Sequence, residues 1–85
     1  MLTKQERKQQ YRAIEKVRLL RVKNLRALQD FYGSTAELSR RIGKAPSFVT
    51  SLCGPNPRRD VGEVLARDIE QLLHLSSGWL DQEHS

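Results

Sequence analysis

The pattern that most restricts the fold of this chain lies in residues 35–52, where two short apolar periods flank a glycine. Leu38 and Ile42 are four residues apart, the spacing of one buried helix edge. Gly43 permits a sharp turn that other residues resist. Pro46 is expected in the first turn of the next helix, where a backbone N–H has no helical acceptor and proline therefore costs no hydrogen bond. The pattern predicts two short helices joined by a tight turn.

The ends of these two helices are also marked. Ser34 or Thr35 is the cap expected for the first helix, because either hydroxyl can accept from a free backbone amide. Val49 and Leu52 are expected to point inward from the second helix. That helix must end at Gly54-Pro55-Asn56-Pro57, a run that breaks regular structure.

The first 32 residues contain no glycine or proline and are rich in good helix formers. They predict one long helix, or two in series with a joint near residues 18–21, where Arg18 and Arg21 interrupt the apolar stripe. The part from residue 22 should pack on the domain, and the basic part before it should project. Gly33 stops the helix. The stripe comprises Tyr11, Ile14, Val17, Val22, Leu25, Leu28 and Tyr32, with Leu20 and Phe31 at its edge.

A further helix follows the proline-rich break. Asp60 with Glu63 resembles a capping box and predicts a helix to about Leu73. Residues 76–78 read as a turn, and Trp79-Leu80 as a short segment that covers the bundle. No stretch alternates like a strand, so the fold class is all-α. The apolar face of this helix is expected to comprise Val61, Leu65, Ile69, Leu72 and Leu73.

Length and composition limit the functions open to the chain. Its 85 residues, 38% of them hydrophobic, suffice for one small helical domain but not for a large enclosed substrate cavity. No apolar run approaches the ~18 residues that span a bilayer, and the N-terminus is too polar for a signal peptide. We therefore expect a cytoplasmic protein without a membrane partner or a small-molecule substrate.

The reactive side chains do not form a catalytic or metal-binding pattern. Cys53 is the only cysteine, cannot form an internal disulfide, and reads as a small packed residue. His74 and His84 are ten residues apart without a cysteine or an acidic cluster at ligand spacing. No glycine-rich loop could cradle a phosphate. The sequence predicts no enzyme, no metal and no cofactor.

Charge is divided along the chain, whose formal net charge is +5. Residues 1–30 carry nine Lys or Arg against three acidic residues, and residues 34–59 carry five against one. Residues 60–85 carry one Arg against six acidic residues. The basic two-thirds can therefore face a polyanion while the acidic end faces away.

The spacing of residues 35–52 is that of a helix-turn-helix, whose second helix enters a DNA major groove. Residues 36–47 resemble the lambda-repressor-like, Cro/C1-type family of bacterial and phage regulators, with Ser39 where the helices meet. They read Ala36-Glu37-Leu38-Ser39-Arg40-Arg41-Ile42-Gly43-Lys44-Ala45-Pro46-Ser47. Residues 61–70 and 78–81 are similar to the segment that follows this motif in many prophage repressors.

The resemblance covers residues 21–81, leaving 1–20 as a basic helical extension and 82–85 as a tail. It implies a compact four- to five-helix DNA-binding domain, here with a long N-terminal helix. It also implies a transcriptional repressor that binds a double-stranded operator as a homodimer. Related repressors often continue into a second domain, so a compact Cro-like regulator and a fragment both remain open.

The resemblance assigns roles to particular side chains. Base contacts fall to Pro46, Ser47, Thr50 and Ser51, with Phe48 at the margin. Phosphate contacts fall to Thr35 with the amides at its helix start, and to Lys44, Arg58 and Arg59.

The chain departs from the family pattern at two points. Lys44 occupies a turn position that is usually apolar, and the second helix has no Arg, Asn or Gln. Those three residue types make the bidentate base contacts, each worth ~1–3 kcal/mol of discrimination. Specificity is therefore expected to rest partly on DNA shape or on the basic N-terminal segment.

Dimerisation and partner choice leave alternatives. Tyr11, Ile14 and Val17 have no obvious partner in so small a domain, so we expect them to pair with a second subunit. Trp79 and Leu80 fit core anchoring, with a part in a dimer interface as the alternative. The same fold would also suit an antitoxin or adaptor that binds a protein, or a non-specific DNA- or RNA-binding module.

Overall fold

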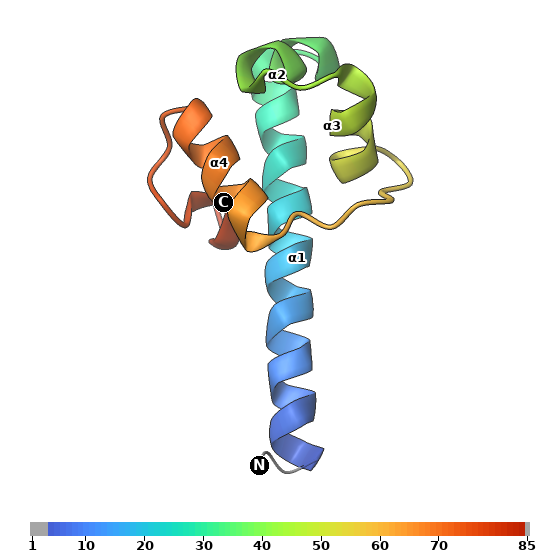
Figure 1. The fold of residues 1–85 in the computed structure, drawn as a ribbon, viewed down its shortest axis with the longest axis vertical. Helices are drawn as coiled ribbons and strands as arrows, with labels where there is room; N and C mark the ends of the chain where they lie inside the picture. The colour runs from blue at the N-terminus through green and yellow to red at the C-terminus, as the bar shows by residue number, and fades with distance from the viewer. Residues whose placement is uncertain (1–3, 85) are drawn as a thin grey trace.

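The computed structural model describes the backbone of residues 4–84 and the side chains of residues 15–84 (Figure 1). Within residues 4–84 the chain is all-helical and contains no strand. The elements are α1 (Lys4–Tyr32), α2 (Thr35–Ile42), α3 (Pro46–Cys53), α4 (Glu63–Leu72) and a short 3-10 helix, η1 (Trp79–Asp81).

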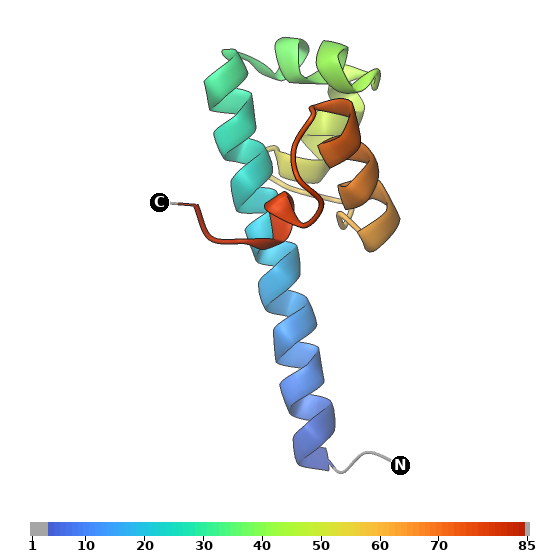
Figure 2. The ribbon, with the colours of Figure 1, turned by 90° about the vertical axis from the view of Figure 1, so that its left-hand side faces the viewer.

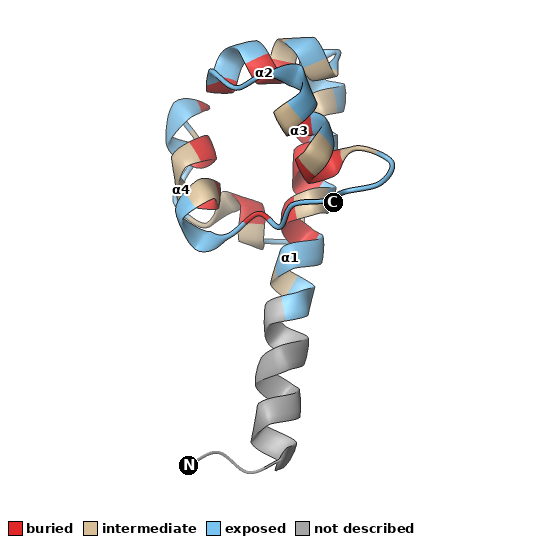
Figure 3. Ribbon diagram, turned by 45° about the vertical axis from the view of Figure 1, so that its right-hand side comes forward, coloured by how far each residue is buried: buried red, intermediate tan, exposed pale blue. Residues whose placement is uncertain are grey.

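Helix α1 is a single helix of 29 residues, so the alternative with a joint near residues 18–21 is wrong. Its C-terminal half packs on the other helices, while its N-terminal half extends beyond them (Figures 1 and 2). The helix continues through the stripe interruption because Arg21 is itself buried and hydrogen-bonded. Along the described part of α1, Val17 is half-buried and Leu20 is the first buried residue; the burial colours are in Figure 3.

The two short helices predicted within residues 35–52 are confirmed. Ser34 is the cap of α2, since its Oγ accepts from the Glu37 amide at 3.1 Å. Gly43 ends α2 with φ +66°, in the left-handed region that glycine adopts without strain. Pro46 is in the first turn of α3, and Leu52 is buried on its inner side as expected.

The core lies where α1, α2, α3 and α4 meet, and most of the predicted core is confirmed. The placement of Leu72 on the apolar face of α4 is wrong, and Phe31, predicted at the edge of the α1 stripe, lies outside the core. Phe31 is 80% exposed and meets Tyr32 edge-on, and Leu72 is 44% exposed. Leu72 lies at the flank of α4 because Ala66, which is fully buried, sets the inward face. The buried apolar cluster comprises Leu25, Leu28, Leu38, Ile42, Val49, Leu52, Cys53, Val61, Ala66, Ile69, Leu73 and Leu80.

The capping box predicted at Asp60 and Glu63 is also wrong. Helix α4 begins at Glu63 after Gly62, and no side chain caps it. The Glu63 carboxylate instead accepts from Arg21 at 2.7 Å. Asp60 lies 3.6 Å from Arg18 in an exposed ion pair. Two arginines of α1 therefore draw both carboxylates away from the helix start.

The C-terminal segment covers the bundle as predicted, because Leu80 is fully buried. Asn24 of α1 donates to the carbonyls of Leu80 and Gln82, both at 2.8 Å. The buried carboxylate of Glu70 accepts from the amides of Gly78 at 2.9 Å and Leu80 at 2.7 Å. Core anchoring is thus confirmed for Leu80, and these bonds fix the segment on α1 and α4.

None of the helices found in residues 4–84 is both long enough and apolar enough to cross a membrane.

Candidate nucleic-acid interface

Helix α3 presents a small polar face to solvent. Pro46, Ser47 and Thr50 are exposed, and the opposite side of the helix is buried in the core. Ser51 is only half-buried, so all four residues predicted to read bases lie on the accessible part of α3. The helical spacing of apolar and polar residues is enough to give this eight-residue helix one exposed side and one buried side.

Ser51 differs from the other three because its polar atoms are already engaged. Its Oγ donates to the Phe48 carbonyl at 2.5 Å. Its own carbonyl accepts from the amides of Arg58 at 2.8 Å and Arg59 at 3.0 Å. The loop after α3 is therefore folded back against the end of that helix.

This folded-back loop places an amide side chain beside α3 that the sequence analysis missed. A shallow hollow of about 200 Å³ lies at this loop, and it is lined by Thr50, Ser51, Pro55, Asn56 and Arg58. Asn56 carries the bidentate donor and acceptor pair that α3 lacks. The signal in the sequence was only the position of Asn56 within the breaker run, which reads as a turn.

The three cations predicted to contact phosphates surround the exposed face of α3. Lys44, Arg58 and Arg59 are exposed and make no ion pair with a carboxylate among residues 15–84. The ring of Phe48 holds two of them, with Lys44 Nζ at 5.8 Å and Arg59 Cζ at 5.3 Å from its centroid. Their charge remains available to an anion.

Thr35 begins α2, where the first backbone amides of the helix have no helical partner. Its Oγ1 accepts a hydrogen bond from Nε2 of Gln29 at 2.6 Å. The oxygen of the same Gln29 amide lies 3.3 Å from the Cys53 sulfur. Burial raises the pKa of the Cys53 thiol, which keeps it protonated, and its packed position is confirmed.

The predicted dimer contacts lie mostly beyond the described side chains. Tyr11 and Ile14 are outside the described side chains, and Val17 is half-buried. The N-terminal half of α1 extends away from α2, as both ribbon views show (Figures 1 and 2). The basic N-terminal segment is therefore remote from the exposed face of α3 within one chain.

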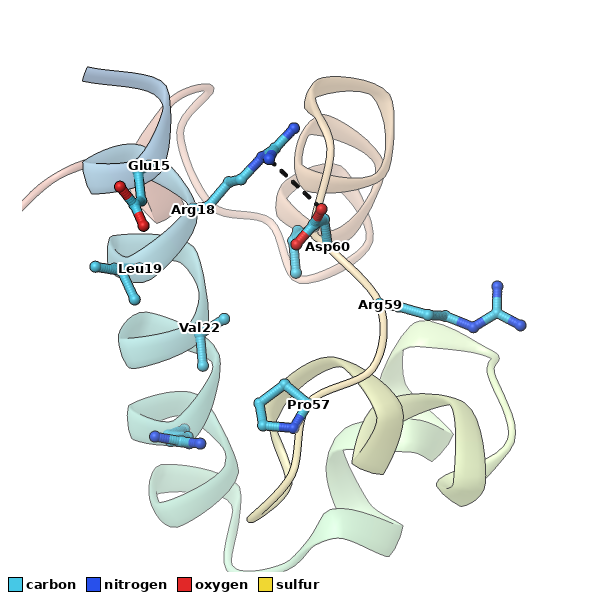
Figure 4. A pocket seen from close by; sticks show the side chains of 9 residues that line it. Glu15, Arg18, Leu19, Val22, Pro57, Arg59 and Asp60 are labelled. Carbon is cyan, nitrogen blue, oxygen red and sulfur yellow. Dashed lines mark ion pairs between the residues drawn. The ribbon is translucent and has the colours of Figure 1, made fainter. Parts of the chain in front are cut away.

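A larger groove lies elsewhere, between α1 and the loop that leads to α4 (Figure 4). It measures about 380 Å³, and Leu19, Val22 and Pro57 give it an apolar floor. The Arg18–Asp60 ion pair crosses its side. Within the described residues no group of histidine, cysteine and carboxylate side chains is placed to hold a metal.

The chain is similar to a known repressor. It is 34% identical over 65 residues to the prophage repressor CohE of Escherichia coli strain K12, and the match covers 76% of this chain. It spans only 29% of the length of that relative. No protein-family model matches, and no solved structure gives a significant match. The likeness thus supports a repressor-like protein, on a fold that is all-helical.

Proposed function

We propose that this chain is a sequence-specific DNA-binding regulator of the prophage-repressor type, which binds a double-stranded operator through the exposed face of α3. One observation carries the proposal: the face of α3 formed by Pro46, Ser47 and Thr50 is exposed, and three cations lie near it. These cations have no acidic ion-pair partner among residues 15–84. The similarity to a prophage repressor supports it.

In this proposal the α2–α3 pair acts as a lambda-repressor-like helix-turn-helix, with α3 in the major groove. Ser47 and Thr50 hydrogen-bond to base edges, and the Thr50 methyl meets a thymine methyl. Lys44, Arg58 and Arg59 neutralise phosphates on either side of the groove. Thr35 and the free amides of α2 bind a further phosphate.

The proposal includes a homodimer, because the palindromic operators of such regulators call for two-fold symmetry. The N-terminal half of α1 supplies the pairing surface, through Tyr11, Ile14 and Val17. The regulator acts in the cytoplasm, and its function requires no cofactor, metal or enzymatic step.

In vitro selection from a random duplex library tests the proposal with the full chain. We expect an enriched palindromic site that survives competition by heterologous DNA with ~10³-fold or greater preference. The spacing of its half-sites should fit one helical turn or a multiple of it. A library that yields no enriched site would contradict sequence-specific binding.

Two other results would redirect the assignment. Equal binding to the selected and heterologous duplexes would favour a non-specific nucleic-acid-binding module. Stable co-purification with the product of a neighbouring gene, with loss of DNA binding, would favour the antitoxin or adaptor function.

A further inference from the structure

We propose that Gln29 is a positioning residue, which turns the hydroxyl proton of Thr35 outward so that it can donate to a DNA phosphate. The inference rests on the proposed function and adds a residue of α1 to it. Gln29 is half-buried where α1 meets the start of α2 and the end of α3. Its amide bonds to Thr35 and Cys53, and neither bond is to a residue predicted to read bases, so it would act through Thr35.

The hydrogen bonds of the Gln29 amide run in one direction. Its oxygen can only accept, and the Cys53 sulfur lies 3.3 Å from it; the same thiol also lies 3.4 Å from the Val49 carbonyl. Its nitrogen can only donate, and it does so to Thr35 Oγ1 at 2.6 Å. When the Cys53 thiol donates to the Gln29 oxygen, it fixes which end of the amide faces Thr35.

This direction determines what Thr35 can do. A threonine hydroxyl has one proton, and when its oxygen accepts from Gln29 that proton is left for another acceptor. Among residues 15–84 the structure gives the Thr35 proton no acceptor. Thr35 also begins an α-helix, where free amides and the helix dipole favour an anion. A phosphate oxygen at this point would receive a hydroxyl and amide donors together.

The arrangement predicts a dependence between two substitutions. Thr35→Val removes the hydroxyl with little change of shape, and we expect it to weaken duplex binding about tenfold, the loss of one hydrogen bond to a charged group. Gln29→Met removes both amide bonds and should weaken binding roughly three- to tenfold. In the Thr35→Val background, Gln29→Met should have no further effect.

The experiment measures fluorescence anisotropy of the duplex found by selection, at fixed salt, with the full chain and each single and double variant. Urea unfolding of every variant shows that the protein is folded under the binding conditions. Equal, additive losses from Gln29→Met in both backgrounds would overturn the inference. So would an unchanged affinity after Thr35→Val in a wild-type chain that binds.

Two readouts separate positioning from a general structural role. Methylphosphonate replacement of single phosphates should identify one position to which wild type is more sensitive than Gln29→Met, because the variant keeps only the amide donors of α2 there. Cys53→Ser keeps a proton donor and should bind as wild type does, whereas Cys53→Ala should weaken binding as Gln29→Met does. Unchanged phosphate sensitivity in Gln29→Met would overturn the inference alone, and wild type that binds no duplex would overturn the proposed function with it.

Discussion

Arg21 occupies a position on α1 where an apolar residue would be expected, and it is only 7% exposed. Its guanidinium donates to Asp81 at 2.6 Å and 3.0 Å, to Glu63 at 2.7 Å and to the Val61 carbonyl at 2.8 Å. The hydrogen bond to Asp81 is the main cause of a raised pKa for Arg21. A buried charge of this kind is tolerated only because every donor group is engaged.

Asp81→Asn should make the stability of the chain less dependent on pH. The hydrogen bond from Arg21, with help from Arg67, lowers the pKa of Asp81 in the folded state. A lowered pKa contributes stability above the unfolded value of about 3.9, and this contribution is lost as pH falls through the folded value. At pH 7 we expect the variant to lose about 1–3 kcal/mol in urea unfolding. The difference from wild type should shrink below pH 4.

Asp68→Asn is the matched control, because Asp68 has no ion-pair partner among residues 15–84. Its unfolding free energy should stay within about 0.5 kcal/mol of wild type at both pH values. An Asp81→Asn deficit of equal size at pH 7 and at pH 3 would show that the loss is not electrostatic.

The side chains of the proposed DNA interface should separate into two kinds. Arg58→Ala should weaken binding to all duplexes alike and flatten the logarithmic salt dependence by about one. Thr50→Ala should change the preferred sequence and leave the salt slope as it is. Ser51→Ala should alter the preferred sequence less than Thr50→Ala does, because the Ser51 hydroxyl is already hydrogen-bonded to the Phe48 carbonyl. Titrations of a duplex panel between 50 and 200 mM salt measure all three. If Arg58→Ala altered sequence preference alone, its role would be base reading.

At the scale of single elements, α2 and α3 could be predicted because their signals are local. A serine cap, Gly43 and Pro46 all act within one turn of their own position. The exposed face of α3 followed from the same periodicity. The start of α4 could not be predicted in this way, because Arg18 and Arg21 compete for its carboxylates from about 40 residues away.

Ser34→Ala and Asp60→Ala compare a real cap with one expected only from sequence. Ser34→Ala should cost about 1 kcal/mol in unfolding free energy, since the Glu37 amide loses its acceptor. Asp60→Ala should cost less than about 0.5 kcal/mol, because it breaks one exposed ion pair. Urea unfolding at pH 7 measures both. A cost for Asp60→Ala that matched Ser34→Ala would restore the capping box.

Contacts between elements were the part of the site that sequence could not predict. Helical periodicity places Gln29 on a face of α1, but it does not indicate that this face meets Thr35 of α2 and Cys53 of α3. The same holds for Asn24, whose amide reaches carbonyls 56 and 58 residues further along the chain. Polar side chains that bridge elements need tertiary structure before their partners can be named.

Considered as a whole molecule, the chain places its two basic regions apart. A helix of 29 residues spans about 43 Å, and the N-terminal half of α1 points away from α2. The backbone of residues 4–14 therefore lies away from the cations around α3 within one chain. Under the proposed function, the specificity that α3 does not supply comes from DNA shape, from the loop that carries Asn56, or from a second subunit.

A chain that lacks residues 1–14 should separate folding from pairing. The buried cluster of the domain lies within residues 25–80, so the shortened chain should still unfold cooperatively in urea. If the proposed dimer forms through this segment, the loss of Tyr11 and Ile14 should convert it into a monomer in sedimentation analysis. Affinity for a palindromic site should then fall steeply, while affinity for a single half-site changes little, because two linked half-sites bind with a high effective concentration. A shortened chain that remained dimeric would place the pairing surface on the folded domain and show that the role predicted for Tyr11 and Ile14 is wrong.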